Sequence, residues 1–312
     1  MMRQRKPLLV ALAVLFAVVC AAQFRGRRGG WGGSGEGPIH YTEGNVLVDE
    51  RTMQTAREVA SHSTDVPMWT NAAGFEKDAF TFCRIFFRNG PYGGSRGTCI
   101  TDFPDSDLNL SFRLQQMTSL VVSPHGRFLR LKNPELYDYP WIYMVEPGRL
   151  LLDDEEATIL RKYLLNGGFL MADDFWGDVQ WENFYEQLKK VFPEREFVEL
   201  PMEHPVFHMV FDLNVPKQKL QTANMMQALR SLYPNSGDYG VTWEWYNGEG
   251  SEEMHVRAML DDKGRIMVIA THNCDNGDGW EREGQNDDFF HAFSEKRAFP
   301  LGINIIFYAM TH

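Results

Sequence analysis

From about residue 79 onward, short apolar runs alternate with segments whose apolar positions follow helical spacing. The longest runs are residues 79–87 (AFTFCRIFF), 141–145 (WIYMV) and 169–172 (FLMA), and shorter ones cover 128–131 and 196–200. Turn-forming residues separate these runs from their neighbours. Strands that are apolar along their whole length are typical of a parallel sheet with both faces covered. The runs therefore predict buried strands.

Helical spacing occurs between the strands and predicts helices at 108–120, 153–166 and 179–191, with a last helix at the end of the chain. The second helix has the clearest start, because Asp153 is a good N-cap and Glu156 completes a capping box. Gly167 and Gly168 then end it. Strands that alternate with helices predict an α/β fold with a mostly parallel sheet covered on both faces.

Three segments depart from this alternation. Residues 254–260 and 265–271 flank a Gly-containing turn and predict a β-hairpin. Residues 214–240 are polar and mixed, which predicts an insertion. Residues 272–281 predict an acidic loop before the last helix.

The first 22 residues predict a signal peptide. Three basic residues precede an unbroken apolar run at 8–19, and the small residues Cys20, Ala21 and Ala22 follow it. Two alternatives remain open, an uncleaved membrane anchor and a lipidated Cys20. The apolar stretch is shorter than the roughly 18–20 residues that span a bilayer comfortably, which favours cleavage. We therefore expect export to the periplasm or the extracellular space, with membrane contact only through an uncleaved anchor.

Residues 23–40 are rich in Gly and Arg and predict a disordered basic linker, followed by a single α/β domain over 41–312. The whole chain has a net charge of −11, and loss of the three basic residues in the signal peptide makes it −14. Phosphate binding needs clustered Lys and Arg, so this acidic domain excludes nucleic acid as a partner.

Ligands of open α/β sheets bind beyond the carboxyl ends of the strands, where this chain carries many acids. Glu146 follows one strand, and Asp173 and Asp174 follow another, so these three are the candidate catalytic residues. Further candidates for ligand binding lie in the same predicted turns: Asp102, Asp105, Asp107, Trp176, His272, Asn273, Asp275 and Asp278. Together they predict an acidic cleft at the carboxyl edge.

The pair Asp173 and Asp174 leaves two interpretations open. Two carboxyl groups can act as general acid and base when their surroundings separate their pKa values. Adjacent residues of an extended chain point in opposite directions, however, so only one would face the cleft. The other interpretation is an Asp that caps the following helix. Trp176 is either a sugar-stacking platform or part of the core.

Metal and cysteine patterns are weak. Asp105 and Asp107 begin like a calcium loop, but the required Gly and Glu are absent, and helix capping is the expected role. Asp275 and Asp278 are weak candidates for a single Ca²⁺ site, with a turn as the default. We predict no cofactor and no established metal site. Cys83 is expected to be a buried hydrophobe, and Cys99 and Cys274 to be either paired or free.

Several segments together resemble a bacterial family called domain of unknown function 4159. They are TDFPDSDLNLSFRLQQMTSL, YPWIYMVEPG, LRKYLLNGGFLMADDFWG, VFPEREFVELPMEHPVF and the C-terminal HNCDNGDGWE and PLGINIIFYAMTH, spread over about 80–312. The resemblance implies a flavodoxin-like three-layer sandwich like that of class I glutamine amidotransferases. It also implies gene neighbours that encode MoxR-type ATPases and von Willebrand-type membrane proteins.

The resemblance does not extend to glutaminase chemistry. In active amidotransferases a nucleophilic cysteine follows the Gly-Gly strand, whereas here Asp173 and Asp174 follow it. We expect an uncharacterised cell-envelope protein, non-enzymatic rather than an enzyme, that binds a small molecule or an envelope protein in its acidic cleft. The alternatives are a carbohydrate- or envelope-directed hydrolase that uses Asp173 or Asp174, and a scaffold in a membrane complex with a MoxR-type ATPase system.

Overall fold

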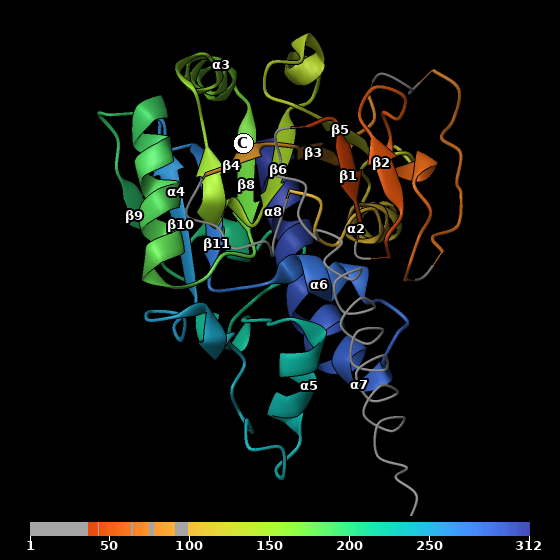
Figure 1. The fold of residues 1–312 in the computed structure, drawn as a ribbon, viewed down its shortest axis with the longest axis vertical. Coiled ribbons are helices and arrows are strands. Elements are labelled where there is room, and N and C mark those ends of the chain that lie inside the picture. The colour runs from red at the N-terminus through yellow and green to blue at the C-terminus, as the bar shows by residue number, and fades with distance from the viewer. Residues whose placement is uncertain (1–36, 43, 64, 75–77, 91–98) are drawn as a thin grey trace, which may run out of the picture.

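A seven-stranded sheet forms the centre of the protein, in the order β5-β3-β6-β8-β11-β10-β9 (Figure 1). The first five strands in this order are mutually parallel, and β10 is antiparallel to both β11 and β9. Their bounds are β5 Arg127–Leu129, β3 Cys83–Ile85, β6 Trp141–Val145, β8 Phe169–Asp173, β11 Ile266–His272, β10 His255–Leu260 and β9 Phe197–Glu199. The prediction of a mostly parallel sheet is confirmed.

The structure is a computed structural model that describes residues 37–42, 44–63, 65–74, 78–90 and 99–312. The predicted signal peptide and most of the predicted linker lie outside these residues. Within the linker range, Ile39 and His40 already belong to strand β1 (Ile39–Tyr41), which pairs with β2 (Leu47–Asp49). The ordered fold therefore begins slightly earlier than predicted.

Helices cover both faces of the sheet and make a three-layer, flavodoxin-like sandwich. Along β6, Ile142 and Met144 pack into one apolar layer, while Trp141, Tyr143 and Val145 pack into the other. This alternation explains why the whole strand is apolar. The first layer is closed by α3 (Asp154–Leu165) and α4 (Gly177–Val191), and the second by α2 (Asp105–Met117) and α8 (Phe299–Thr311).

Shorter helices lie beyond the sheet, at the lower end of the view in Figure 1. They are α5 (Met225–Leu232), α6 (Asn276–Glu281) and α7 (Asp287–Phe289), and a π-helical segment at Phe290–Ala298 joins α7 to α8. A two-stranded pair, β4 (Arg88–Asn89) with β7 (Leu150–Leu151), completes the fold. Because α6 begins four residues after β11 ends, these helices border the carboxyl edge of the sheet.

Most predicted elements are confirmed, with three corrections. The predicted capping box is present, since the Asp153 side chain accepts from Glu156 N at 2.9 Å and the Glu156 side chain accepts from Asp153 N at 3.0 Å. The predicted strand at 79–87 is shorter, because only Cys83–Ile85 pairs continuously with neighbours. The predicted acidic loop at 272–281 contains helix α6, and the predicted insertion at 214–240 contains helix α5.

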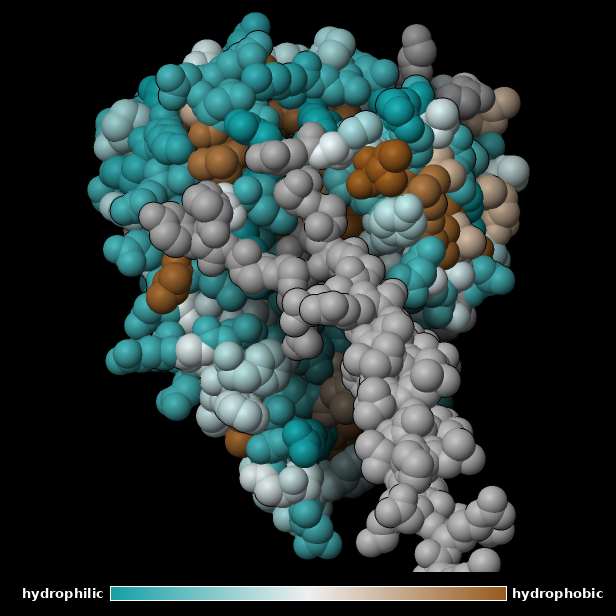
Figure 2. Space-filling view, viewed as in Figure 1, coloured by the Kyte–Doolittle hydropathy of each residue, from teal (hydrophilic) through white to brown (hydrophobic). Residues whose placement is uncertain are grey.

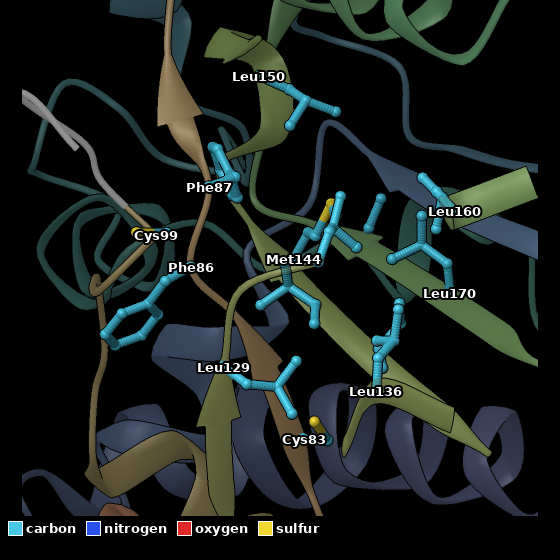
Figure 3. Close-up of a cluster of buried hydrophobic side chains, with 14 of the residues drawn as sticks. Cys83, Phe86, Phe87, Cys99, Leu129, Leu136, Met144, Leu150, Leu160 and Leu170 are labelled. Carbon is cyan, nitrogen blue, oxygen red and sulfur yellow. The ribbon is translucent and has the colours of Figure 1, made fainter. Parts of the chain in front are cut away.

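Cys83, Cys99 and Cys274 are free and fully buried. Cys83 lies beside Leu129 and Leu136, and Cys99 lies near Phe86 in the same apolar cluster (Figure 3). The alternative in which Cys99 pairs with Cys274 is therefore wrong. Burial also raises the pKa of each thiol, most simply because a thiolate is poorly solvated in an apolar core.

Among the described residues, no helix combines the length and the apolar composition needed to cross a membrane.

A buried ion pair joins strand β3 to helix α2. The fully buried Arg84 guanidinium donates through Nε to both Asp107 carboxylate oxygens at 3.1 Å and also contacts Asp107 through Nη2. It further donates to the Thr101 carbonyl at 2.8 Å and to Ser106 Oγ at 2.8 Å. The pair therefore holds the chain segment that leads into α2.

We predict that Asp107→Ala lowers the free energy of unfolding by about 3–5 kcal/mol, because it leaves the Arg84 charge buried without its partner. Urea denaturation followed by tryptophan fluorescence measures the change. The matched control is Glu194→Ala, which breaks the half-exposed pair between Glu194 and Arg161 and is expected to cost at most about 1 kcal/mol. Equal losses in the two variants would contradict the prediction.

Candidate functional site

A pocket of about 560 Å³ opens at the carboxyl edge of the sheet. Six acidic side chains from five segments of the chain line it: Asp102, Glu146, Asp174, Glu244, and the pair Asp275 and Asp278 at the start of α6. The tight turns after the strands and the loop before α2 bring these groups together. Arg149 and Arg282 are the basic residues among its described lining. We call this site the acidic pocket.

The backbone turns sharply at three of these acids. Asp102, Glu146 and Asp174 have φ values of 62°, 49° and 54°, in the left-handed region that non-glycine residues rarely adopt. Glu146 and Asp174 each come directly after a parallel strand, β6 and β8. A left-handed residue costs roughly 1–2 kcal/mol. Such strain is typical of functional sites, where the surrounding fold holds the residue in place.

Asp174 is the most constrained of these acids. Its side chain is 7% exposed, and Oδ1 accepts a hydrogen bond from Trp176 Nε1 at 2.8 Å. Its backbone N–H donates to the Cys274 carbonyl at 3.0 Å. Burial, followed by the negative charges of Glu146 and Glu244, raises the pKa of Asp174 well above its usual value. The carboxyl group can therefore carry a proton, or bind a positive charge that replaces one.

Asp275 and Asp278 belong to the start of helix α6. Asp275 is its N-cap and accepts from Asp278 N at 2.7 Å through Oδ1. Asp278 accepts from Arg282 Nε at 2.8 Å and from Met225 N. Burial, followed by the charge of Asp174, raises the pKa of Asp275 well above its usual value. Asp278 thus has local partners, whereas Asp275 keeps one oxygen for the pocket.

Residues 224–247 form a wall of the pocket that was not predicted from the sequence. Glu244 is buried and accepts from Asn224 N at 3.0 Å and from Asn247 Nδ2 at 2.7 Å, and Tyr246 lines the pocket beside it. The available signal was the aromatic and Gly-rich stretch WEWYNGEG at 243–250. Nothing in its spacing shows that it folds back onto the strand ends.

Asp173 has a structural role and lies outside the pocket lining. Its fully buried carboxylate accepts five hydrogen bonds, from Thr271 Oγ1 (2.5 Å), Tyr143 Oη (3.1 Å), and the side chain (2.7 Å) and backbone (3.0 Å) of Asn276, and from Gly277 N (3.1 Å). Burial raises its pKa to about 6 even though these donors lower it. The predicted capping of the following helix is wrong, because the N-cap of α4 is Trp176 and no side chain caps it. Asp173 instead accepts from the first N–H groups of α6, and Asp174 is the member of the pair that lines the pocket.

Asp105 and Asp107 also lie outside the pocket lining. Asp105 accepts from His62 N at 3.0 Å and from Ser61 Oγ, which ties the segment before residue 64 to the start of α2. Asp107 pairs with Arg84. Both are buried in the first turn of α2, but neither is the N-cap, which is Pro104. Their carboxylates are used by the fold.

His272 and Asn273 also support the fold beside the pocket. Burial, with the nearby Arg257 guanidinium, lowers the pKa of His272 to about 3, so the ring is neutral. Asn273 Oδ1 accepts from Gly177 N at 2.8 Å, and its Nδ2 donates to the Gly250 and Glu253 carbonyls at 2.7 Å. Asn273 therefore connects β11, the start of α4 and the 243–250 loop.

Trp176 has features of both predicted roles, the sugar-stacking platform and the core residue. It lines the pocket, but its side chain is 2% exposed and its indole N–H is used by Asp174. That burial leaves no open ring face for a sugar to stack on. Trp176 instead orients the Asp174 carboxylate.

Carboxylates in and beside the pocket form three groups whose oxygen or nitrogen atoms lie within 4.8 Å of one another. The first is Asp102, Asp174 and Asp275, the second is Asp102, Asp278 and Glu281, and the third is His62, Asp105 and Glu281. In the third group, His62 Nε2 contacts Glu281 Oε1 and its Nδ1 lies 3.1 Å from Asp105 Oδ2.

A larger hollow of about 840 Å³ lies at the antiparallel end of the sheet, beside Trp181, Phe197 and His255. Its charged groups neutralise one another, since Glu199 contacts Lys217, His255 at 3.2 Å and Arg257 at 3.5 Å. We therefore favour the acidic pocket as the functional site, because its buried charges are concentrated and of one sign.

Comparison with known families agrees with the resemblance seen in the sequence. The sequence model of the family described as "Domain of unknown function (DUF4159)" matches residues 91–310, more than two thirds of the chain. The match covers α2, the strands from β5 onward, and every acidic side chain of the pocket. No curated protein matches the chain.

The raised pKa of Asp174 predicts a pH-dependent effect of Asp174→Asn on stability. A carboxyl group with a raised pKa in the folded protein stabilises it below the unfolded pKa of 3.8, and this contribution is lost as the pH rises through the folded value. In EDTA at pH 7.5, Asp174→Asn should therefore raise the free energy of unfolding by about 1 kcal/mol or more, since each tenfold change in proton affinity corresponds to about 1.4 kcal/mol. The gain should shrink toward pH 4.5.

Urea denaturation at several pH values measures this effect. Glu186→Gln, on the exposed side of α4, is the control and should change stability little at any pH. The prediction is contradicted if Asp174→Asn destabilises the protein by the same amount at every pH. In that case the ionised Asp174 carboxylate does not lower the stability of the folded protein.

Proposed function

Because this chain belongs to the DUF4159 family, whose description states no activity, we propose from its site that the protein is an exported module of the cell envelope. In this proposal it binds a small ligand in the acidic pocket. The observation that carries the proposal is the convergence of Asp174, Asp275 and Glu244 on one cavity. All three are buried and have raised pKa values. Burying several carboxyl groups together lowers the stability of the fold, so such a cluster is expected where function requires it. Titratable groups with perturbed pKa values in a cleft are typical of binding sites.

The size and chemistry of the pocket support a small polar ligand. A volume of about 560 Å³ lies within the usual range for small-molecule sites, about 300–1,000 Å³. Carboxylates accept hydrogen bonds, so the pocket favours hydroxyl and amino groups on the ligand. Tyr246, which is half exposed, and Met226 add apolar surface at its mouth. Sugars and amines that occur in cell-envelope material have this combination of groups.

A second candidate function is hydrolysis with Asp174 as general acid. The specific observation is the raised pKa of Asp174, since a carboxyl group that can carry a proton in a cleft can serve as the general acid of glycoside hydrolysis. Glu146 lines the same pocket and would be the second carboxyl group. Asp173 is not a candidate for this chemistry, because its oxygens are occupied by five donors. Turnover of a glycan substrate that Asp174→Asn abolishes would favour the enzyme.

The scaffold alternative stays a prediction, as does a partnership with a MoxR-type ATPase system. On the face shown in Figure 2, hydrophilic residues predominate and hydrophobic ones occur in small separate groups. A docking surface would be expected as one larger apolar patch. This face therefore supports a ligand-binding module more than a scaffold.

Ligand binding is tested by thermal unfolding in the presence of N-acetylglucosamine, chitobiose, spermidine and single amino acids, each with EDTA and with added divalent cations. We expect at least one compound class to raise the melting temperature of the wild type. Asp174→Asn or Asp275→Asn should lower the ligand affinity at least about tenfold, since each removes a charged hydrogen-bonding group. The rise in melting temperature should then be smaller in both variants. Glu186→Gln should keep it. Equal responses from all four proteins would remove the pocket from consideration.

Export is tested by expressing the full chain in a bacterium and sequencing the N-terminus of the protein from the envelope fraction. We expect a mature protein that begins at Gln23, because small residues precede that position. Leu12→Arg interrupts the apolar run and should keep the chain in the cytoplasm. Full-length wild-type chain in the cytoplasm would contradict export, and full-length chain in the membrane would favour the anchor alternative.

A further inference from the structure

We propose that Asp102, Asp174 and Asp275 bind a hard divalent cation in the acidic pocket, Ca²⁺ in preference to Mg²⁺. This inference deepens the proposed function and rests on it in one respect, namely that the acidic pocket is where the protein meets its ligand. The cation would supply positive charge beside the Asp174 and Asp275 carboxylates.

The spacing of the three carboxylates fits one ion. One oxygen of each lies within 4.8 Å of the others. Two ligands of the same ion cannot lie farther apart than twice the metal–oxygen distance, which is about 4.8 Å for Ca²⁺ and about 4.2 Å for Mg²⁺. The three oxygens are therefore close enough to one another to approach a single ion. The number of further oxygen atoms around the pocket, and not this spacing, favours Ca²⁺ over Mg²⁺.

Two of the three ligands have an oxygen without a partner in the described part of the chain. Asp174 is 7% exposed and Asp275 is 4% exposed. Oδ1 of Asp174 accepts from Trp176, and Oδ1 of Asp275 accepts from Asp278 N. No described residue donates to Oδ2 of either side chain or forms an ion pair with it. Both side chains line the pocket, so these oxygens point into it. Buried carboxylates in proteins are normally paired or bound to a metal.

Other buried acids nearby are held by donors of the fold, unlike Oδ2 of Asp174 and of Asp275. Asp173 has five donors, Asp107 has the Arg84 guanidinium, and Asp278 has Arg282 Nε and Met225 N. Arg282 Nε also lies 2.7 Å from Glu281 Oε2. The Arg282 guanidinium therefore offsets the negative charge of the second group, which contains Asp278 and Glu281. The group around His62 is likewise held by its own contacts. Among the three groups in the described part of the chain, we therefore favour the first, which combines close spacing with the open Oδ2 atoms of Asp174 and Asp275.

The chemistry of the ligands favours a hard ion. All three are carboxylates, and the group contains no histidine or thiolate of the kind that zinc prefers. Glu146 and Glu244 line the same pocket and offer further oxygen atoms. Calcium takes six to eight oxygen ligands, so water or hydroxyl groups of the bound ligand would complete its shell.

Gly277 gives independent support for a close approach of Asp102. A Cβ atom at this position would collide with Asp102 Oδ2 and would lie 3.2 Å from Tyr143 Oη. The first turn of α6 therefore needs a glycine so that the Asp102 carboxylate can come to rest beside Asp174 and Asp275. The fold brings the three charges together across two loops and a helix start.

The test uses purified protein stripped with EDTA and unfolded thermally in about 0.15 M NaCl, which screens non-specific surface binding. We expect about 10 mM CaCl₂ to raise the melting temperature by about 3–6 °C, as a site with a dissociation constant near 0.1 mM would. MgCl₂ should have a smaller effect. Asp174→Asn and Asp275→Asn should lose the shift, whereas Glu186→Gln should keep it.

Terbium luminescence gives a second measurement that needs no variant. Tb³⁺ replaces Ca²⁺ at oxygen sites, and Trp176, hydrogen-bonded to Asp174, lies close enough to sensitise its emission. We expect emission on excitation of tryptophan, displaced by CaCl₂.

Three results would overturn the proposal: no calcium shift in the wild type, equal shifts in the wild type and both Asp variants, or terbium emission that CaCl₂ does not displace. These outcomes separate the cation from the proposed function. Sugar or amine binding that persists in EDTA without a calcium effect would refute the cation and keep the binding function. A calcium shift in a protein that responds to none of the organic compounds would support the cation site and refute the proposed binding of an organic ligand.

Discussion

The carboxylate of Asp173 is the point on which the carboxyl edge of the sheet depends. It lies at the end of the central strand β8 and accepts hydrogen bonds from Tyr143 of β6, Thr271 of β11 and the first two backbone N–H groups of α6. Neighbouring strands and a helix start are thereby held by one buried side chain. Because its oxygens are satisfied, the next residue, Asp174, can turn into the pocket in a left-handed conformation. The geometry of the site follows from this arrangement.

The acidic pocket is a place where the fold gives up stability. Buried carboxylates of like charge raise one another's pKa values, and left-handed backbone at Asp102, Glu146 and Asp174 adds strain. Rigid surroundings offset these costs. Arg84 and Asp107 hold the segment before α2, and Asn273 joins β11 to α4 and to the 243–250 loop. Such a concentration of unfavourable terms at one edge is typical of functional sites, and it is why we propose that a ligand binds here.

Much of the architecture could be predicted because it depends on local patterns. Runs such as WIYMV are apolar on both faces, and the capping box at Asp153 is a local sequence signal, so the strand, the helix and the parallel sheet were all predictable. Helix α6 was missed because its six residues, NGDGWE, contain two glycines and no apolar periodicity. It forms because Asp275 caps it and Asp173 receives its first N–H groups, and the second of these contacts joins residues about a hundred positions apart.

The sequence by itself determined that acids follow the strands of an α/β fold, and hence that the carboxyl edge is acidic. It could not determine which acids meet. Asp173 and Asp174 are adjacent residues of the same type, so the sequence does not distinguish them. The left-handed turn after β8 places Asp173 in the core and Asp174 in the pocket. Asp105 and Asp107 lie outside the pocket because they contact His62 and Arg84. Glu244 lines the pocket although it belongs to a loop with no recognisable motif. These choices depend on contacts between segments far apart in the chain, and such contacts exist only once the sheet has formed.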